Sequence, residues 1–287
     1  MFAVRRSIIV ITLSIFMSGC SFSFVYNKLD WWVSWYLDDY VELDKTQQHV
    51  FDKAFNRLHA WHRTNELMRY HSHLARFQQR VNEIPTGNPI TADEIYAHTN
   101  EMQEHWYRFI DAAEPYLSPL MAQLSSKQKQ GLIDNLAERN DKRVEERKKS
   151  TYEKRIKENI KDQQKSFKKW FGRLSKHQNL LVEETTPTYT SSFDDWIAYR
   201  TLWLSNFDNA LMTDADNQIN AVALTHALVN AQDLRSPEFK EKIEYNNRIF
   251  AQMLAEFLNQ ASAKQFKRFN RRVTSYLEDF EELAQEN

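Results

Sequence analysis

Glycine is scarce in this chain, and this scarcity constrains its fold more than any other feature. The sequence has four glycines in 287 residues, whereas roughly 7% glycine is usual for globular proteins. Sheets need tight turns, many of which require glycine, so a sheet-rich fold is disfavoured. The glycines, Gly19, Gly87, Gly131 and Gly172, also lie far apart. This separation excludes the clustered glycines of nucleotide-binding loops.

Apolar residues recur at helical spacing along most of the chain. The clearest runs are 51–84, expected as one long amphipathic helix, and then 193–211, 239–258 and 269–283. No stretch shows the sustained alternation of a strand. The sequence therefore predicts an all-α bundle of about eight to ten amphipathic helices of unequal length.

Prolines and capping residues predict where these helices begin and end. Thr91 with Glu94 has the capping-box pattern, and Ser236 is an expected N-cap. Proline breaks a helix interior, so we expect all six prolines between helices. They are Pro85, Pro89, Pro115, Pro119, Pro187 and Pro237. Residues 20–287 are expected to form a single helical domain, with two helical subdomains joined near 183–192 as the alternative.

The first twenty residues have the pattern of an export signal. Arg5 and Arg6 precede an apolar stretch at 7–17, which is too short to span a bilayer because about 20 residues are needed. Residues 1–19 are therefore predicted to be a cleaved signal peptide. The sequence Met-Ser-Gly-Cys at 17–20 resembles the lipobox of bacterial lipoproteins, which implies a covalent lipid on Cys20, the single cysteine of the chain. The alternatives are an ordinary signal peptide and an uncleaved N-terminal anchor.

The lipobox resemblance also implies a location. Ser21 after the cysteine is similar to the outer-membrane sorting class, so we expect a lipid anchor at the periplasmic face of the outer membrane. Two or more acyl chains anchor a protein stably, since each buried CH₂ contributes about 0.8 kcal/mol. Export and a net charge of −1 argue against nucleic acid as a partner.

The segment after the cysteine carries a second resemblance. YNKLDWW at 26–32 and WYLDDYV at 35–41 resemble the opening of an uncharacterised family of Gram-negative lipoproteins, a domain of unknown function, and the likeness extends over most of the chain. It implies no catalytic residue. The aromatic residues of this segment are expected either at the membrane headgroup boundary, where such rings are favoured, or in the helical core. They include Trp31, Trp32, Trp35 and Tyr36.

Three short segments share a capping pattern. Residues 43–47, 124–128 and 261–265 each place a capping side chain three residues before a glutamine. The pattern resembles the Leu-Thr-x-x-Gln motif of Spy- and CpxP-type periplasmic chaperones, which implies a chaperone-like protein that binds protein clients. The alternative is an ordinary capping box at each helix start. The three glutamines lie 81 and 137 residues apart, which argues against a clean tandem repeat.

The stretch 139–173 is strongly basic, with 14 Lys or Arg against 6 Asp or Glu. If 125–173 is one helix, it is roughly 70 Å long at 1.5 Å per residue, and part of it projects or lines a groove. The alternative is a solvated face of paired charges. Its candidate residues for binding an acidic envelope component or acidic clients are Lys142, Arg143, Arg147, Lys148, Lys149, Lys154, Arg155, Lys157 and Lys161.

Histidines and glutamates at helical spacing suggest metal ligands as an alternative. One set is His59, His62 and Glu66, and a second is His98, Glu101 and His105, with Glu94 one turn before His98. Imidazoles and carboxylates on one helix face are ligands for zinc or a di-metal centre. The leading expectation is no metal, no catalytic residue and no cofactor except the lipid. The sequence thus predicts a non-enzymatic binding, chaperone-like or scaffold lipoprotein, and the alternative is a metal-dependent envelope hydrolase.

Overall fold

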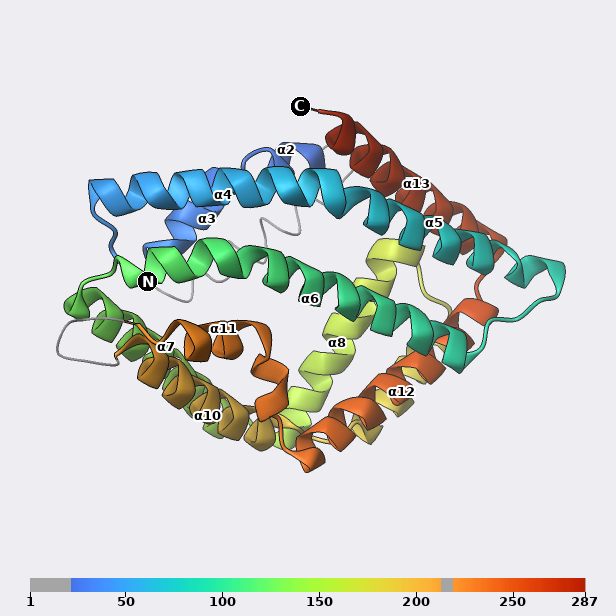
Figure 1. Cartoon of the computed structure of the whole chain (residues 1–287). Coiled ribbons are helices and arrows are strands. Elements are labelled where there is room, and N and C mark those ends of the chain that lie inside the picture. Colours follow the sequence, from blue (N-terminus) through green and yellow to red (C-terminus); the bar gives the residue numbers. More distant parts are fainter. Residues whose placement is uncertain (1–21, 213–218, 287) are drawn as a thin grey trace.

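In the computed structural model, residues 22–212 and 219–286 are described, and every regular element among them is helical (Figure 1). The prediction of an all-α bundle is confirmed. The predicted signal peptide and Cys20 lie outside the described residues. The α-helices are α2 (Phe22–Tyr26), α3 (Leu29–Leu37), α4 (Lys45–Asn65), α5 (Leu67–Asn82), α6 (Ala92–Ala122), α7 (Ser126–Lys148), α8 (Tyr152–Phe171), α9 (Lys176–Thr185), α10 (Phe193–Leu211), α11 (Ala221–Val229), α12 (Pro237–Asn259) and α13 (Ala263–Gln285). Three 3₁₀ turns, η1 (Ile84–Thr86), η2 (Thr186–Thr188) and η3 (Ala231–Leu234), connect some of them.

The helices form a layered bundle (Figure 1). Helices α4 and α5 run beside α6, while α7, α10 and α11 pack together along the opposite side. Helix α12 packs on α6, and α13 packs on α5 and α8. The two capping predictions are confirmed, because Thr91 and Glu94 form a complete capping box and the Ser236 hydroxyl accepts the amide of Phe239.

The run 51–84, expected as one helix, is two helices. They meet at Glu66, whose backbone has φ −105° and whose side chain is buried. The Glu66 carboxylate lies against Arg108 of α6, at 2.9 Å from Nε. The break between α4 and α5 thus lies at a residue that forms an ion pair with α6. The spacing of apolar residues along the chain does not reveal this break.

The prediction that all six prolines lie between helices is wrong for Pro115 and Pro119, which lie inside α6. Each removes a backbone donor from the helix. Helix α6 nevertheless continues because it packs against α4, α11 and α12 along its length, and tertiary packing of this kind supplies most helix stability in proteins.

The basic stretch is also divided, so the condition for a single 70 Å helix over 125–173 is not met. Helix α7 ends at Lys148, and Thr151 caps α8, with its hydroxyl accepting the amide of Lys154. A hydroxyl at an N-cap favours extended backbone, and Thr151 has ψ 161°. This break turns the chain between two segments rich in lysine and arginine.

The main core lies between α5, α6, α8, α9, α12 and α13. Aromatic rings dominate it: Phe171 stacks on Phe269 at 5.4 Å between centroids, and Phe167 stacks on Phe257 at 4.3 Å. This core therefore joins residues from both sides of the 183–192 segment. A second core lies between α7, α10 and α11, around Phe207.

The glutamines of the capping boxes pair across the bundle. Gln47 and Gln128 exchange side-chain amide hydrogen bonds at 3.0 and 2.7 Å. A fourth box, Ser175 with Gln178, pairs in the same way with Gln265. Gln178 follows Gln47 by 131 residues, and Gln265 follows Gln128 by 137 residues. The same pairing of capping-box glutamines therefore occurs twice along the chain. The three boxes recognised in the sequence do not reveal this repeat.

Candidate functional site: an arginine-lined cleft

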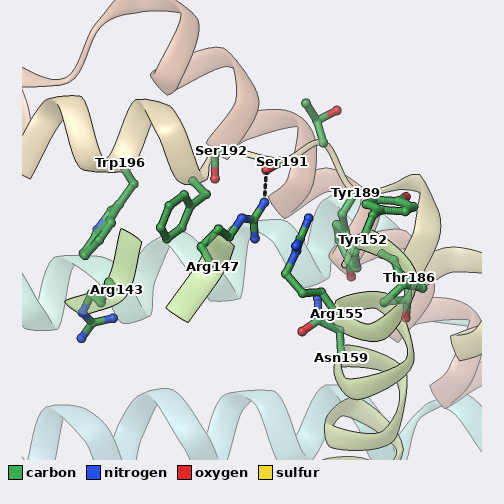
Figure 2. Close-up of a pocket in the computed structure, with 13 residues that line it drawn as sticks. Arg143, Arg147, Tyr152, Arg155, Asn159, Thr186, Tyr189, Ser191, Ser192 and Trp196 are labelled. Atoms are coloured by element: carbon green, nitrogen blue, oxygen red, sulfur yellow. Dashed lines mark hydrogen bonds between the residues drawn. The ribbon is translucent and has the colours of Figure 1, made fainter. Parts of the chain in front are cut away.

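A cleft of about 380 Å³ lies where α7 ends and α8 begins, opposite the start of α10 (Figure 2). Its lining combines guanidinium, hydroxyl and aromatic groups. The residues are Arg143, Arg147, Tyr152, Arg155, Ile156, Asn159, Thr186, Tyr189, Thr190, Ser191, Ser192, Phe193 and Trp196.

The break between α7 and α8 brings the three arginines to this cleft. Arg143 and Arg147 are four residues apart near the end of α7, so they project from one helix face. Arg155 lies at the start of α8, and its guanidinium donates a hydrogen bond to the carbonyl oxygen of Ser150. In an unbroken helix, Arg147 and Arg155 would lie one after the other along the same helix axis. Because the chain turns between α7 and α8, the two side chains instead line one cavity (Figure 2).

The opposite wall is the segment from Thr186 to Trp196, which includes most of the predicted 183–192 linker. Asn246 of α12 fixes this segment by two hydrogen bonds. Its Oδ1 accepts the amide of Thr190 at 2.9 Å, and its Nδ2 donates to the carbonyl of Thr190 at 2.9 Å. The segment is therefore a defined wall of the cleft.

The cleft is electropositive. No carboxylate lines it, and none of the three arginines forms an ion pair with any carboxylate of residues 22–212 and 219–286. Arg147 donates one hydrogen bond, from Nη2 to the Ser191 hydroxyl at 2.8 Å. Burial and the neighbouring positive charge of Arg155 lower the pKa of Arg147, while Asp194 opposes this effect. Arg147 remains protonated, since a guanidinium titrates far above neutral pH.

Aromatic rings orient two of the arginines. The Arg147 guanidinium lies over Phe193, at 4.6 Å from the ring centroid, and Arg143 lies over Trp196 at 5.1 Å. Cation–π contacts of this kind hold the guanidinium plane in place and leave its edges free to donate hydrogen bonds. Burial raises the pKa of Tyr189 to about 12, so its hydroxyl stays neutral.

The chemistry of the cleft suits an oxyanion. A guanidinium has five N–H donors in a rigid fork that matches phosphate and carboxylate oxygens. Toward the part of the chain that the structure describes, Arg147 and Arg155 each donate one hydrogen bond, so most of the donors are left for a ligand. The volume lies within the range of about 300–1,000 Å³ typical of small-molecule sites. Tyr152, with 53% of its surface exposed, presents a ring face at the rim.

Three of the nine predicted basic residues, Arg143, Arg147 and Arg155, line the cleft. Lys142 and Lys148 form ion pairs with Glu138 and Glu145 on their own helix. The other four, Lys149, Lys154, Lys157 and Lys161, are exposed and lie outside the lining. The sequence gives no signal for Tyr152, Ser191 or Trp196, because their roles arise only when the 186–196 segment folds against the α7–α8 junction.

The four aromatic residues expected near the membrane lie on α3, which has no buried residue. Trp31 and Tyr36 are 59% and 46% exposed. The rings of Trp31, Trp32 and Trp35 contact one another, with centroids 4.9 and 6.2 Å apart. Trp31 and Tyr36 therefore lie at the surface, whereas Trp32 and Trp35 are half-buried. Among the described helices, none is both long enough and apolar enough to cross a membrane.

The predicted metal ligands lie on α4 and α6 and at the α4–α5 junction, and they do not meet in the two sets expected. His62 lies between two tyrosine hydroxyls, with Nδ1 2.9 Å from Tyr26 Oη and Nε2 3.1 Å from Tyr70 Oη. His59 stacks on Phe55, and Glu94 pairs with Arg80. Glu66, in contrast, lies beside His105 of the second set, at 3.2 Å.

Comparison with family models places the chain. A family model described as a family of unknown function, DUF6279, matches residues 39–240. The chain belongs to this family. The DUF6279 match covers α4 to α11 and contains every residue of the cleft. The expectation of an uncharacterised family is thus confirmed. Curated proteins and solved structures gave no match to this DUF6279 protein.

Proposed function

We propose that this DUF6279 protein is a lipid-anchored, non-enzymatic envelope protein whose cleft binds an anionic sugar, one that carries a phosphate or a carboxylate. One observation carries the proposal: three guanidiniums without carboxylate partners among the described residues surround a cleft of about 380 Å³. Uncompensated positive charge at a built cavity favours an anionic occupant. The exposed Tyr152 ring offers an apolar face on which a sugar ring can stack.

Anchoring follows from the N-terminal segment. From the lipobox-like sequence we propose a lipid on Cys20, two residues before α2 begins. The exposed rings of α3 come soon after it, and amphipathic rings are favoured at the headgroup boundary. The anchor would hold the cleft near the periplasmic face of the outer membrane, where an acidic envelope glycan or a phosphorylated lipid headgroup is within reach.

The chaperone-like alternative rests on the glutamine motifs. In the structure these glutamines bond to one another, and Gln47, Gln178 and Gln265 are buried. Their capping and pairing stabilise the bundle, and only Gln128 among the four is half-exposed. This favours the cleft, and not the motif, as the binding element.

Calorimetry on the full chain in detergent tests the proposal, with glucose 1-phosphate, glucuronate, inorganic phosphate and glucose as probes. We expect glucose 1-phosphate or glucuronate to bind and glucose not to bind. Tighter binding of glucose 1-phosphate would indicate a phosphorylated sugar as the ligand, and tighter binding of glucuronate would indicate a uronic acid. Binding of inorganic phosphate as tightly as glucose 1-phosphate would contradict the sugar part, and no binding of any anion would contradict the proposal as a whole.

Matched variants locate the site. Arg147→Ala and Arg155→Ala remove a lining guanidinium, whereas Lys157→Ala removes an exposed charge of α8 outside the lining. Affinity should fall in the first two variants and stay unchanged in the third. Equal losses in all three would show a diffuse charge effect in place of a site.

A further inference from the structure

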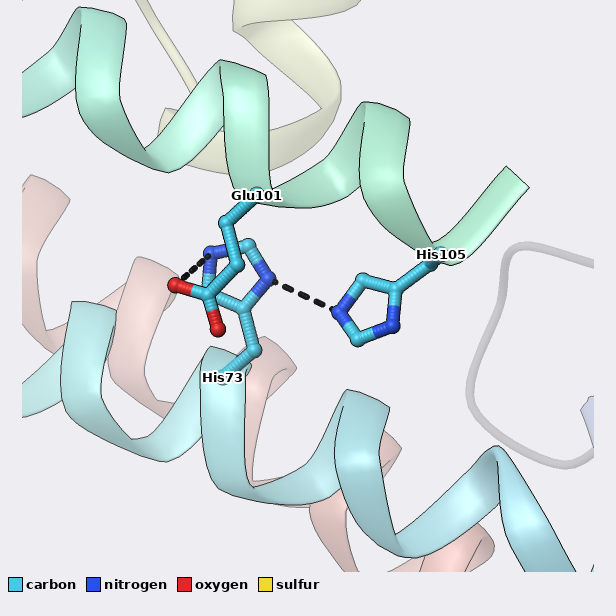
Figure 3. A group of neighbouring side chains, drawn as sticks. All are labelled: His73, Glu101 and His105. Carbon is cyan, nitrogen blue, oxygen red and sulfur yellow. Dashed lines mark hydrogen bonds and ion pairs between the residues drawn. The ribbon is translucent and has the colours of Figure 1, made fainter. Parts of the chain in front are cut away.

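His73, Glu101 and His105 meet between α5 and α6 (Figure 3). Glu101 and His105 are four residues apart on α6, so both project toward α5, and His73 faces them. One nitrogen or oxygen atom from each side chain lies within 4.8 Å of the others. His73 Nδ1 is 3.3 Å from His105 Nε2, and His73 Nε2 is 3.6 Å from Glu101 Oε2.

We infer that His73, Glu101 and His105 form a binding site for a divalent transition metal, with zinc as the preferred ion. Two imidazoles and one carboxylate are a common protein donor set for zinc. With Zn–N bonds of about 2.0–2.1 Å, two nitrogens on a tetrahedral zinc lie about 3.3 Å apart. The separation between His73 Nδ1 and His105 Nε2 already has this value, so the two imidazoles need little rearrangement. Glu101 Oε2 lies nearest the other ring nitrogen of His73, Nε2, and has to move toward Nδ1 to share the metal.

The surrounding groups orient the ligands. Glu66 Oε2 lies 3.2 Å from His105 Nδ1, and Arg108 contacts both Glu66 oxygens and the same nitrogen. A metal at His105 Nε2 assigns the proton to Nδ1, which then donates to Glu66. The Arg108 guanidinium, which has only donors, then has to leave this nitrogen and keeps its two bonds to Glu66. A carboxylate behind a ligating histidine is the usual support of zinc sites. Glu66 is buried, so this support is fixed within the bundle.

Glu101 leaves one face of the site accessible. It is 41% exposed, whereas His73 and His105 are almost buried. Arg76 bonds to Glu101 Oε1, so Oε2 remains for a metal. With three protein ligands the fourth position is taken by water. The ring of His98 stacks on His73, and its Nδ1 is 3.2 Å from His73 Nε2.

Zinc titration of the full chain in detergent tests the site, with calorimetry for affinity and Co²⁺ visible absorption for geometry. We expect one Zn²⁺ per chain, intensified Co²⁺ bands typical of tetrahedral coordination, and no binding of Mg²⁺, which prefers six oxygen ligands. His73→Ala and Glu101→Gln should each weaken zinc binding at least tenfold. His71→Ala, two residues from His73 on the same helix, should leave it unchanged.

A competitor variant sharpens the test. Arg76→Ala removes the cation that holds Glu101, so zinc should bind more tightly. An unchanged zinc affinity in this variant would show that Glu101 is not a ligand. Glu101→Gln keeps the volume of a partly exposed side chain, so its fold should survive even where His73→Ala unfolds. Absence of zinc binding in the unaltered chain, or unchanged affinity in Glu101→Gln, would overturn the inference. Anion binding at the cleft is measured separately, so either proposal can fail alone.

Discussion

Gln178 and Gln265 exchange hydrogen bonds between their side-chain amides, with N–O distances of 3.3 and 2.8 Å, although 87 residues separate them. Each glutamine also completes the capping box of its own helix, α9 or α13. Gln265 Nε2 further donates to the carbonyl of Arg173. One pair of side chains thus fixes two helix starts against each other in the buried interior.

Removing one member of this pair should destabilise the protein. Gln178→Ala leaves the buried Gln265 amide with fewer partners and weakens a cap, so we expect a loss of about 1–3 kcal/mol in the free energy of unfolding. Urea unfolding of both single variants and the double variant measures the coupling. We expect a coupling of about 0.5–3 kcal/mol between residues in contact; additive effects would show that the two glutamines act independently.

Two glycines should respond to alanine with opposite signs. Gly172 ends α8 at φ +80°, and an added Cβ would lie 3.1 Å from Arg268 Cδ. Gly172→Ala should therefore cost about 1–3 kcal/mol. Gly131 lies inside α7 with nothing within 4 Å of an added Cβ, so Gly131→Ala should stabilise by about 0.5–1 kcal/mol. Thermal or urea unfolding of the two variants checks both signs.

The cleft predicts a salt-sensitive interaction. A hydrogen bond to a charged group contributes about 1.5–3 kcal/mol, so Arg147→Ala should weaken binding of a charged sugar about tenfold or more. Raising the ionic strength should weaken binding in the unaltered chain, because salt screens charges at a partly open site. Calorimetry at two salt concentrations measures this. A salt-independent affinity would contradict an electrostatic cleft.

His62 predicts a loss of stability in mild acid. Burial lowers its pKa to about 4, with Glu66 opposing and His59 adding to the effect, whereas an unfolded histidine titrates near 6.5. The unfolded state therefore binds the proton more readily as pH falls from about 6.5 toward 4, and the folded state loses stability in that window. We expect roughly 1–2 kcal/mol lost at pH 5 on account of His62. Urea unfolding at pH 7 and pH 5 should show a smaller difference for His62→Phe than for the unaltered chain.

The anchor is tested by cell fractionation. Cys20→Ser removes the proposed lipid attachment, so the protein should move from the membrane fraction to the soluble fraction. Trp31→Ser removes one exposed ring and keeps the acyl chains, which supply most of the membrane affinity; this variant should stay with the membrane. Retention of Cys20→Ser in the membrane would indicate an uncleaved N-terminal anchor.

The fold class could be predicted because it depends on local signals. Scarce glycine, helical periodicity and the Thr91 and Ser236 caps each follow from neighbouring residues. The predictions that are wrong also rest on local signals. Proline predicts a helix break at Pro115 and Pro119, but α6 continues through both. A continuous helix over the basic stretch is not formed, because the chain breaks at Ser150 and Thr151. In the first case packing against three helices outweighs the cost of proline.

The candidate sites divide in the same way. Arg143, Arg147 and Arg155 were recognisable as basic residues, and Glu101 and His105 as metal-type side chains at helical spacing. Their partners, Ser191 and Trp196 in the cleft and His73 in the metal cluster, belong to other elements. Spacing along one helix indicates which side chains share a face, but it does not indicate which element lies opposite.

By itself, therefore, the sequence determined that this chain is helical, where several of its helices begin, and which residue types were available for binding. Only the tertiary structure decided which of those residues meet, because the meeting points depend on breaks at Glu66 and Thr151 and on packing between helices far apart in the chain. Helix propensity and capping act over a few residues, whereas a cleft or a ligand cluster requires long-range packing that no local pattern encodes.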